Sequence, residues 1–118
     1  MHTQPREIAP LSGPYPVVEL NYWAKSSAPG VFLVRNKDSR VEQVGYSDRD
    51  VRRAIAEAAR QTGANEFLIE YAMTAARLFY LSCILFHFFH LEERQHHPEW
   101  RDQSARCPVP DCMFNPTH

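Results

Sequence analysis

The stretch "GVFLVRNKDSRVEQVGYSDRDVRRAI", residues 30–55, decides the fold that we predict for this chain. Residues 30–36 are apolar and rich in strand-forming side chains, which is typical of a buried strand. Asn, Asp and Ser within residues 36–40 favour a tight turn. Residues 41–47 then indicate a second strand, so the two segments together predict a β-hairpin.

A helix is predicted directly after this hairpin, over about residues 49–61. Ser47 or Asp48 can accept hydrogen bonds from its first N–H groups, and Gly63 is placed to end it. Its apolar side chains recur at helical spacing, which gives the helix one face for a core. These side chains are Val51, Ile55 and Ala58.

One more strand and one more helix follow along the chain. Residues 65–73 alternate in the manner of a strand, and an apolar helix is expected from about Thr74 to Glu93. The order strand, strand, helix, strand, helix predicts an α+β fold. We expect a small antiparallel three-stranded sheet flanked by helices, in β-β-α-β-α order, followed by an irregular Cys/His tail.

Composition and length indicate an ordinary folded domain of 118 residues with a formal net charge of −1. Contact with nucleic acid would therefore need a local basic patch. We divide the chain into a proline-rich arm with a short strand at 17–23 (residues 1–28), a domain (29–95) and a tail (96–118). Three cysteines and the absence of a secretory signal in the sequence predict a reducing, cytoplasmic setting.

The long apolar segment 71–91 is nearly long enough to cross a bilayer. Arg77, His87 and His90 interrupt it, however, and a strand-like segment runs directly into it. We therefore expect no membrane contact and a core helix buried on two sides. A homodimer interface through the same helix is an open alternative.

The hairpin and the helix after it resemble the GIY-YIG nuclease domain, over about residues 29–95. Gly30 and Val31 match the first family motif, and Val44 and Gly45 match the second. Arg53 falls on the family's helical arginine. The resemblance implies a fold with this order of elements and metal-assisted phosphodiester cleavage, in which two tyrosines, the arginine and a glutamate act together.

Three of the four groups that the resemblance assigns to catalysis are replaced. Phe32 and Gln43 stand at the two tyrosine positions, and Ser82 stands near the glutamate position. A phenyl ring cannot donate or accept a hydrogen bond, and Gln43 supplies no phenolate. Serine is a poor sole anchor for Mg²⁺. We therefore expect a relative that has lost nuclease activity and acts as a nucleic-acid-binding or interaction module.

Two other functions stay open from the sequence. A divergent endonuclease dependent on Mg²⁺ or Mn²⁺ could use Arg53 with Tyr46, Tyr71 or Glu70 in migrated roles. A dimeric structural protein is the second alternative, because the helix over residues 78–91 is so apolar.

A basic helix face is the predicted contact for nucleic acid. Arg49, Arg53 and Arg60 have i, i+4, i+11 spacing, and they lie beside the turn that contains Gly45 and Ser47. Such a ridge suits phosphate contacts. Acidic residues are interspersed, so a solvated helix face explains the same pattern.

Cysteine and histidine residues near the C-terminus suggest a zinc site. Cys107 and Cys112 have C-x4-C spacing, and two thiolates with two imidazoles complete a tetrahedral Zn²⁺ site. The upstream histidines are His87, His90, His96 and His97. Similarity to a small GIY-YIG-like group with the same order of residues implies the set His87, His97, Cys107 and Cys112. His90 or His96 could replace a member, and surface histidines with plain thiols are the alternative. Four protein ligands would leave no open position, which indicates structural zinc.

Overall fold

The computed structural model of the chain describes residues 11–72, 74–92, 95–98, 107–109 and 112. The strands are β1 (Ser12–Pro16), β2 (Gly30–Arg35), β3 (Val41–Ser47) and β4 (Glu66–Tyr71). The helices are α1 (Leu20–Trp23), α2 (Val51–Thr62) and α3 (Ala75–Phe88), and a short 3-10 helix, η2 (Val17–Glu19), precedes α1. This confirms the α+β class.

The predicted hairpin is present as β2 and β3, which pair in antiparallel register with Phe32 opposite Gly45. Its turn follows the expected chemistry, because the side-chain oxygen of Asn36 accepts from the backbone N–H groups of Asp38 at 2.9 Å and Arg40 at 3.0 Å. β4 pairs with the other side of β2, also antiparallel. β2 therefore lies between two strands.

The prediction of three strands was wrong, because the sheet has four, in the order β1-β4-β2-β3. β1 comes from the segment expected to be an extended arm, and it pairs with β4. Pro14 and Pro16 lack a backbone N–H, which suits an edge strand. The short strand expected at 17–23 is helical instead, as η2 and α1.

Both main helices have shorter bounds than predicted. α2 begins at Val51, because Asp50 is its N-cap and accepts from the Arg53 N–H at 3.3 Å. Ser47 instead shapes the preceding turn by accepting from the Asp50 N–H at 2.9 Å. Gly63, at φ 76°, ends α2 as expected.

α3 is capped by Thr74 and ends at Phe88. The expected end at about Glu93 was wrong, because the helix stops at its C-cap Phe89 and residues 90–92 are not helical.

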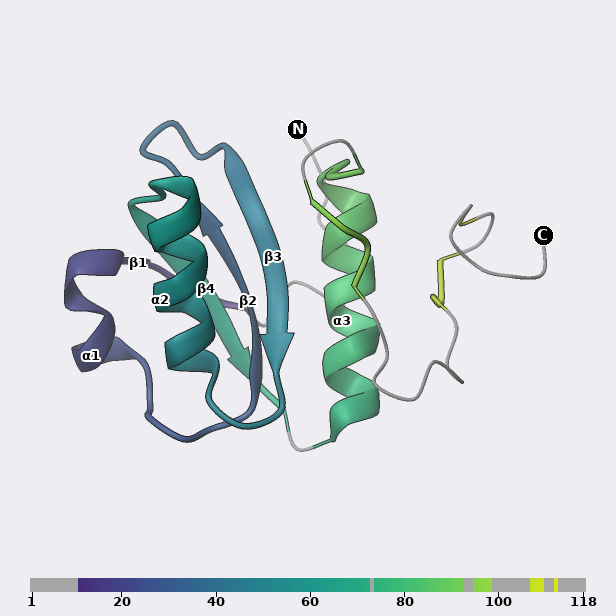
Figure 1. Ribbon diagram of the computed structural model, residues 1–118, viewed down its shortest axis with the longest axis horizontal. Coiled ribbons are helices and arrows are strands. Elements are labelled where there is room, and N and C mark those ends of the chain that lie inside the picture. Colours follow the sequence, from purple (N-terminus) through teal and green to yellow (C-terminus); the bar gives the residue numbers. More distant parts are fainter. Residues whose placement is uncertain (1–10, 73, 93–94, 99–106, 110–111, 113–118) are drawn as a thin grey trace.

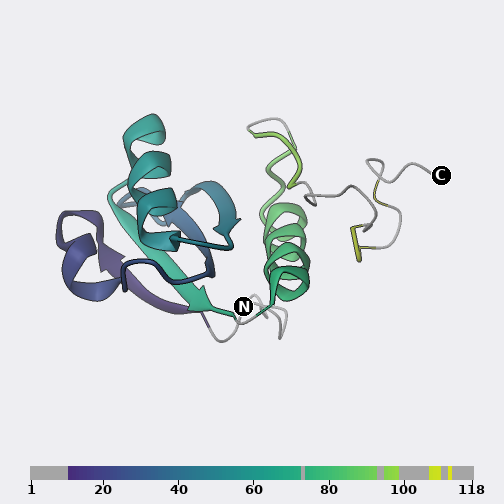
Figure 2. The same cartoon turned by 60° about the horizontal axis from the view of Figure 1, so that its bottom comes forward.

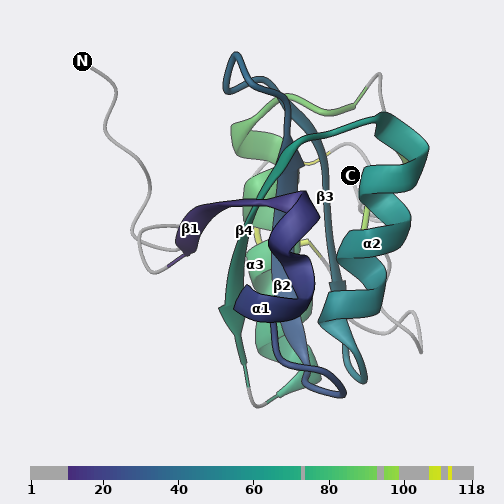
Figure 3. The ribbon, with the colours of Figure 1, turned by 90° about the vertical axis from the view of Figure 1, so that its left-hand side faces the viewer.

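Two separate cores lie on opposite faces of the sheet. α2, with α1 beside it, covers one face, and α3 covers the other (Figures 1 and 3). Phe32, Ile55 and Phe67 belong to the core under α2. Val31 and Phe86 belong to the core under α3. Neighbouring β2 residues face opposite cores, which explains the unbroken apolar run of this strand.

α3 is buried on two sides, as expected. Its outer side carries Phe79 and Cys83, which form a third cluster with Cys107 and Cys112. Residues 107–109 lie on the side of α3 away from the sheet (Figure 2). These contacts within one chain account for the apolar composition of α3. None of the described helices is long and apolar enough to cross a membrane.

Candidate metal centre

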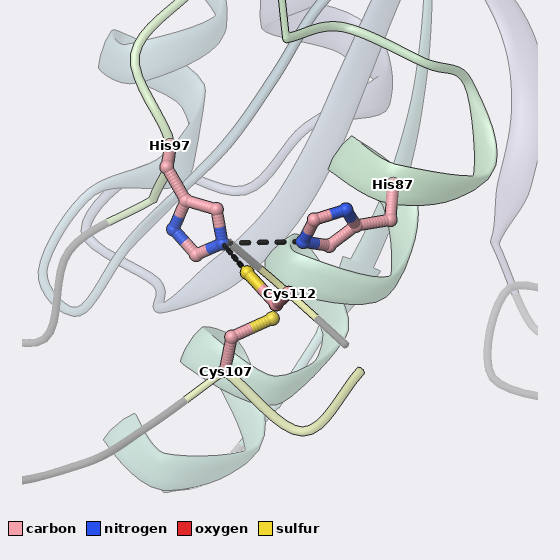
Figure 4. Close-up of side chains that lie close together, drawn as sticks. All are labelled: His87, His97, Cys107 and Cys112. Atoms are coloured by element: carbon pink, nitrogen blue, oxygen red, sulfur yellow. Dashed lines mark hydrogen bonds between the residues drawn. The ribbon is translucent and has the colours of Figure 1, made fainter. Parts of the chain in front are cut away.

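The four residues predicted to hold zinc lie together beside α3 (Figure 4). His87 belongs to the last turn of α3, and the other three come from the segment after it. One potential ligand atom from each residue lies within 4.8 Å of all the others. These side chains are close enough together to bind a metal such as zinc. They are His87, His97, Cys107 and Cys112.

Two distances between nitrogen and sulfur atoms of the cluster can be compared with the edges of a zinc tetrahedron. The Nε2 atoms of His87 and His97 are 3.3 Å apart, and His97 Nε2 is 3.5 Å from Cys112 Sγ. Zn–N and Zn–S bonds of ordinary length at tetrahedral angles place two nitrogens about 3.3 Å apart and a nitrogen and a sulfur about 3.6 Å apart. Both distances match edges of a zinc-sized tetrahedron.

The histidine rings are oriented for metal binding through Nε2. His97 Nδ1 lies 2.7 Å from the carbonyl oxygen of Pro98. A carbonyl only accepts, so Nδ1 carries the proton and Nε2 keeps its lone pair for a metal. His87 Nδ1 lies 3.7 Å from the Glu92 carboxylate, which is longer than a direct hydrogen bond. The contact of His97 with Pro98 resembles the partners that orient metal-binding histidines, whereas Glu92 lies beside His87 without a direct hydrogen bond.

Burial shifts the pKa of two of the four candidate ligands, His87 and Cys107. It lowers the pKa of His87, and the neighbouring His97 lowers it further, so the His87 imidazole is neutral at pH 7. Burial raises the pKa of the Cys107 thiol. Burial also raises the pKa of Cys83, which packs against this cluster without belonging to the four-ligand group. A bound cation would stabilise the buried thiolates.

The other candidate histidines are not in the cluster. His90 is exposed, with a φ of 54°, and follows the end of α3. His96 precedes His97 and is not part of the four-ligand group. Within the part of the chain that the structure describes, this is the one group of three or more such side chains suited to a metal.

The family nuclease positions are divided between the two faces of the sheet. Phe32 is only 3% exposed in the core under α2. Gln43 pairs with Val34, which also faces α2, so both side chains point to that face. Ser82 lies on α3, across the sheet, where its hydroxyl donates to the Phe79 carbonyl at 2.9 Å. The structure therefore does not bring Ser82 to the other positions.

The residues that a divergent nuclease could use in place of the family tyrosines and glutamate also lie on both faces of the sheet. Tyr46 packs in the core under α3 and against the cysteine cluster. Glu70 pairs with Val31, which faces α3. Tyr71 packs on the α2 face, and its hydroxyl accepts from the Lys25 N–H at 2.8 Å.

Only two of the three arginines predicted to contact nucleic acid remain as candidates in the structure. Arg49 precedes the first residue of α2, so helical spacing does not relate it to the other arginines. Arg60 forms an ion pair with Glu57, which reduces its effective charge. Arg49 and Arg53 remain as two exposed guanidinium groups near the start of α2.

Gly45 serves the core in this structure. It faces the ring of Phe32, and a Cβ atom added at this glycine would lie 3.0 Å from Phe32 Cζ. Its place in the family motif therefore has a packing explanation.

Comparisons of the chain with protein families, with curated proteins and with solved structures find no match. The resemblance to the GIY-YIG domain stays a prediction.

Proposed function

We propose that this chain is a zinc-binding domain in which four side chains hold one structural Zn²⁺. The observation that carries the proposal is the match between the distances at His97 Nε2 and the edges of a zinc tetrahedron. The donor set of two imidazoles and two thiolates suits zinc more than Mg²⁺ or Ca²⁺, which prefer oxygen ligands. The proposed ligands are His87, His97, Cys107 and Cys112.

The zinc has a structural role in this proposal. Four protein ligands leave no open position for water or substrate. The ion would join the end of α3 to the segment that carries Cys107 and Cys112, and that segment covers Phe79 and Cys83 on the outer side of α3. The C-terminal part of the chain has few apolar residues, so metal binding supplies folding free energy that burial alone does not.

Zinc content and cysteine variants test this function. Purified protein should contain about one zinc ion per chain, and Co²⁺ in its place should give thiolate-to-cobalt charge-transfer bands. Cys107→Ala should lose both signals. Cys83→Ala is the matched control, because this third buried thiol lies outside the ligand group, and it should retain them. Zinc far below one per chain in the unmodified protein would refute the proposal.

We further propose that the domain is GIY-YIG-like, lacks nuclease activity and works as an interaction module in a reducing cytoplasm. The burial of Phe32, the hydrogen bond of Ser82 within α3 and the division of the family positions between two faces support the loss of nuclease activity. The order of elements from β2 to α3 supports the resemblance. Supercoiled DNA incubated with Mg²⁺ or Mn²⁺ should stay intact. Nicking that disappears in Arg53→Ala would overturn the proposal.

A second candidate function is weak nucleic-acid binding through Arg49 and Arg53, favoured by their exposure near the start of α2. Binding that rests on phosphate contacts weakens as salt concentration rises. Fluorescence anisotropy with a labelled oligonucleotide at low salt should therefore show binding that Arg49→Ala and Arg53→Ala each reduce. Arg60→Ala is the matched control, because Glu57 already pairs with this arginine. Equal binding by all three variants would exclude these contacts.

A further inference from the structure

Gln95 connects the segment that carries His97 to the middle of β3. Its side-chain oxygen accepts from the Val44 N–H at 2.8 Å, and its side-chain nitrogen donates to the Val44 carbonyl at 3.1 Å. The same nitrogen lies 3.2 Å from the His96 carbonyl, and the Gln95 N–H donates to the Leu91 carbonyl at 3.1 Å. The Gln95 side chain therefore joins β3 to the metal-binding segment, and its backbone N–H joins the same residue to the chain just after α3.

The Gln95 side chain bonds to Val44 where a further strand would otherwise pair with the edge of the sheet. β3 is an edge strand, and residues along an antiparallel strand direct their backbone groups alternately toward the neighbouring strand and away from it. Both backbone groups of Val44 bond to Gln95, so they point away from β2. A primary amide carries a donor and an acceptor, as a neighbouring strand does. The Gln95 side chain thus completes the pairing of Val44 at the edge.

We propose that Gln95 is a positioning residue for the metal centre, which rests on the zinc site proposed above. His97 follows Gln95 by two residues and has its Nε2 atom 3.3 Å from that of His87. The two bonds from Gln95 to Val44 fix the position of the chain just before His97. They therefore restrict the conformations of this segment to those in which the His97 imidazole lies near His87. Coupling between two sites is reciprocal, so a bound metal also holds the Gln95 clamp closed on Val44.

The chemistry of the clamp requires glutamine. Asparagine is one methylene shorter and cannot span the same gap. Glutamate keeps the oxygen acceptor for the Val44 N–H but loses the donor to the Val44 carbonyl. Alanine removes both bonds. All three substitutions therefore weaken the clamp, and glutamate would also place a carboxylate oxygen against the Val44 carbonyl oxygen.

Zinc affinity, measured by competition with a chromophoric chelator, tests the proposal. Gln95→Ala should weaken zinc binding by about 10-fold or more, as loss of an outer partner at a metal site typically does. Gln95→Glu should also weaken zinc binding, because a carboxylate oxygen would replace the donor that faces the Val44 carbonyl. Gln61→Ala is the matched control, since the Gln61 amide bonds only Glu57 among the contacts of the described residues, and it should bind zinc as the unmodified protein does. Circular dichroism of each zinc-free variant checks that the fold is retained.

Hydrogen exchange supplies a readout that a general loss of stability would not reproduce. Removing zinc from the unmodified protein should speed exchange at the Val44 amide much more than at the Gly45 amide, which faces β2 in the alternating pattern. In Gln95→Ala the Val44 amide should exchange fast with or without zinc. Wild-type zinc affinity in Gln95→Ala, or equal changes at Val44 and Gly45, would overturn the role of Gln95 alone. An unmodified protein that binds no zinc would overturn the zinc site and this inference together.

Discussion

Replacing Gly45 with alanine tests whether this glycine serves the core or a ligand. A Cβ atom at position 45 would lie 3.0 Å from Cζ and 3.1 Å from Cε1 of the Phe32 ring. Phe32 is 3% exposed and packed among residues of β4 and α2, so the ring has little space into which it can move. The new methyl group must therefore displace either the ring or the β3 backbone. We expect Gly45→Ala to destabilise the domain.

The expected loss follows from two opposing effects. Carbon atoms in contact prefer about 3.5–4.0 Å, so the methyl group is roughly 0.5 Å too close. Overpacking of this kind costs about 1–3 kcal/mol. Replacing a strand glycine by alanine returns about 0.5–1 kcal/mol of backbone entropy. The net loss lies between roughly 0 and 2.5 kcal/mol and is centred near 1 kcal/mol, or about 4 °C in Tm at about 4 °C per kcal/mol for a domain of this size.

A double-mutant cycle measured by urea unfolding at saturating zinc isolates the contact. Phe32→Leu removes the ring atoms that the methyl group would meet, so Gly45→Ala should cost almost nothing in the Phe32→Leu background. The coupling energy should be about 1–2 kcal/mol, as for residues in direct contact. Additive effects within about 0.5 kcal/mol would refute the packing explanation.

Three further results are expected. Ser82→Glu, which restores the acid of the family motif, should lower the free energy of unfolding by about 3–5 kcal/mol, because it places a charge without a partner at a side chain that is 0% exposed. A urea midpoint equal to that of the parent would contradict this. Zinc binding at pH 7 should release about two protons, measured by calorimetry in buffers of different ionisation enthalpy, because thiol ligands must lose their protons. Burial raises the pKa of Cys107 and lowers that of His87, so the protons come from thiols and affinity rises with pH; release near zero would contradict the assignment. Removing zinc with a chelator should expose the outer side of Phe79, giving increased binding of a hydrophobic dye and a larger mass at high protein concentration, and unchanged dye binding would show that the segment stays in place without metal.

The hairpin could be predicted from local sequence, whereas the additional strand β1 could not. Turn residues at 36–40 and apolar runs on both sides specify β2 and β3 without help from the rest of the chain. Residues 12–16 have no apolar face and contain two prolines, and they become a strand only by pairing with distant β4. The start of α2 was misplaced because Ser47, Asp48 and Asp50 are all capping residue types, and only the backbone shows which one accepts.

The metal-binding residue types were predictable, but their geometry was not. The spacing of Cys107 and Cys112 indicates a zinc site, whereas four histidines are candidates for the two remaining ligand positions. The end of α3 determines that His87, and not His90, belongs to the cluster. His90 follows that end with a φ of 54° and lies outside the cluster. Gln95 carries no sequence signal at all, because its importance depends on a contact with Val44, which is far away in the chain.

The proposed zinc site and the proposed arginine contacts lie on opposite sides of the sheet. The four candidate metal ligands lie beside α3 on one side of the sheet, and Arg53 lies on α2, which covers the opposite face. Because the sheet with its two packed cores separates them, a metal at His97 cannot contact a phosphate held by Arg53. Metal-assisted cleavage at the arginine would need a second ion, and Ser82 cannot hold one there, because it lies on α3 across the sheet and has no carboxylate. Loss of zinc should therefore weaken any binding at Arg53 only to the extent that it unfolds the sheet between them.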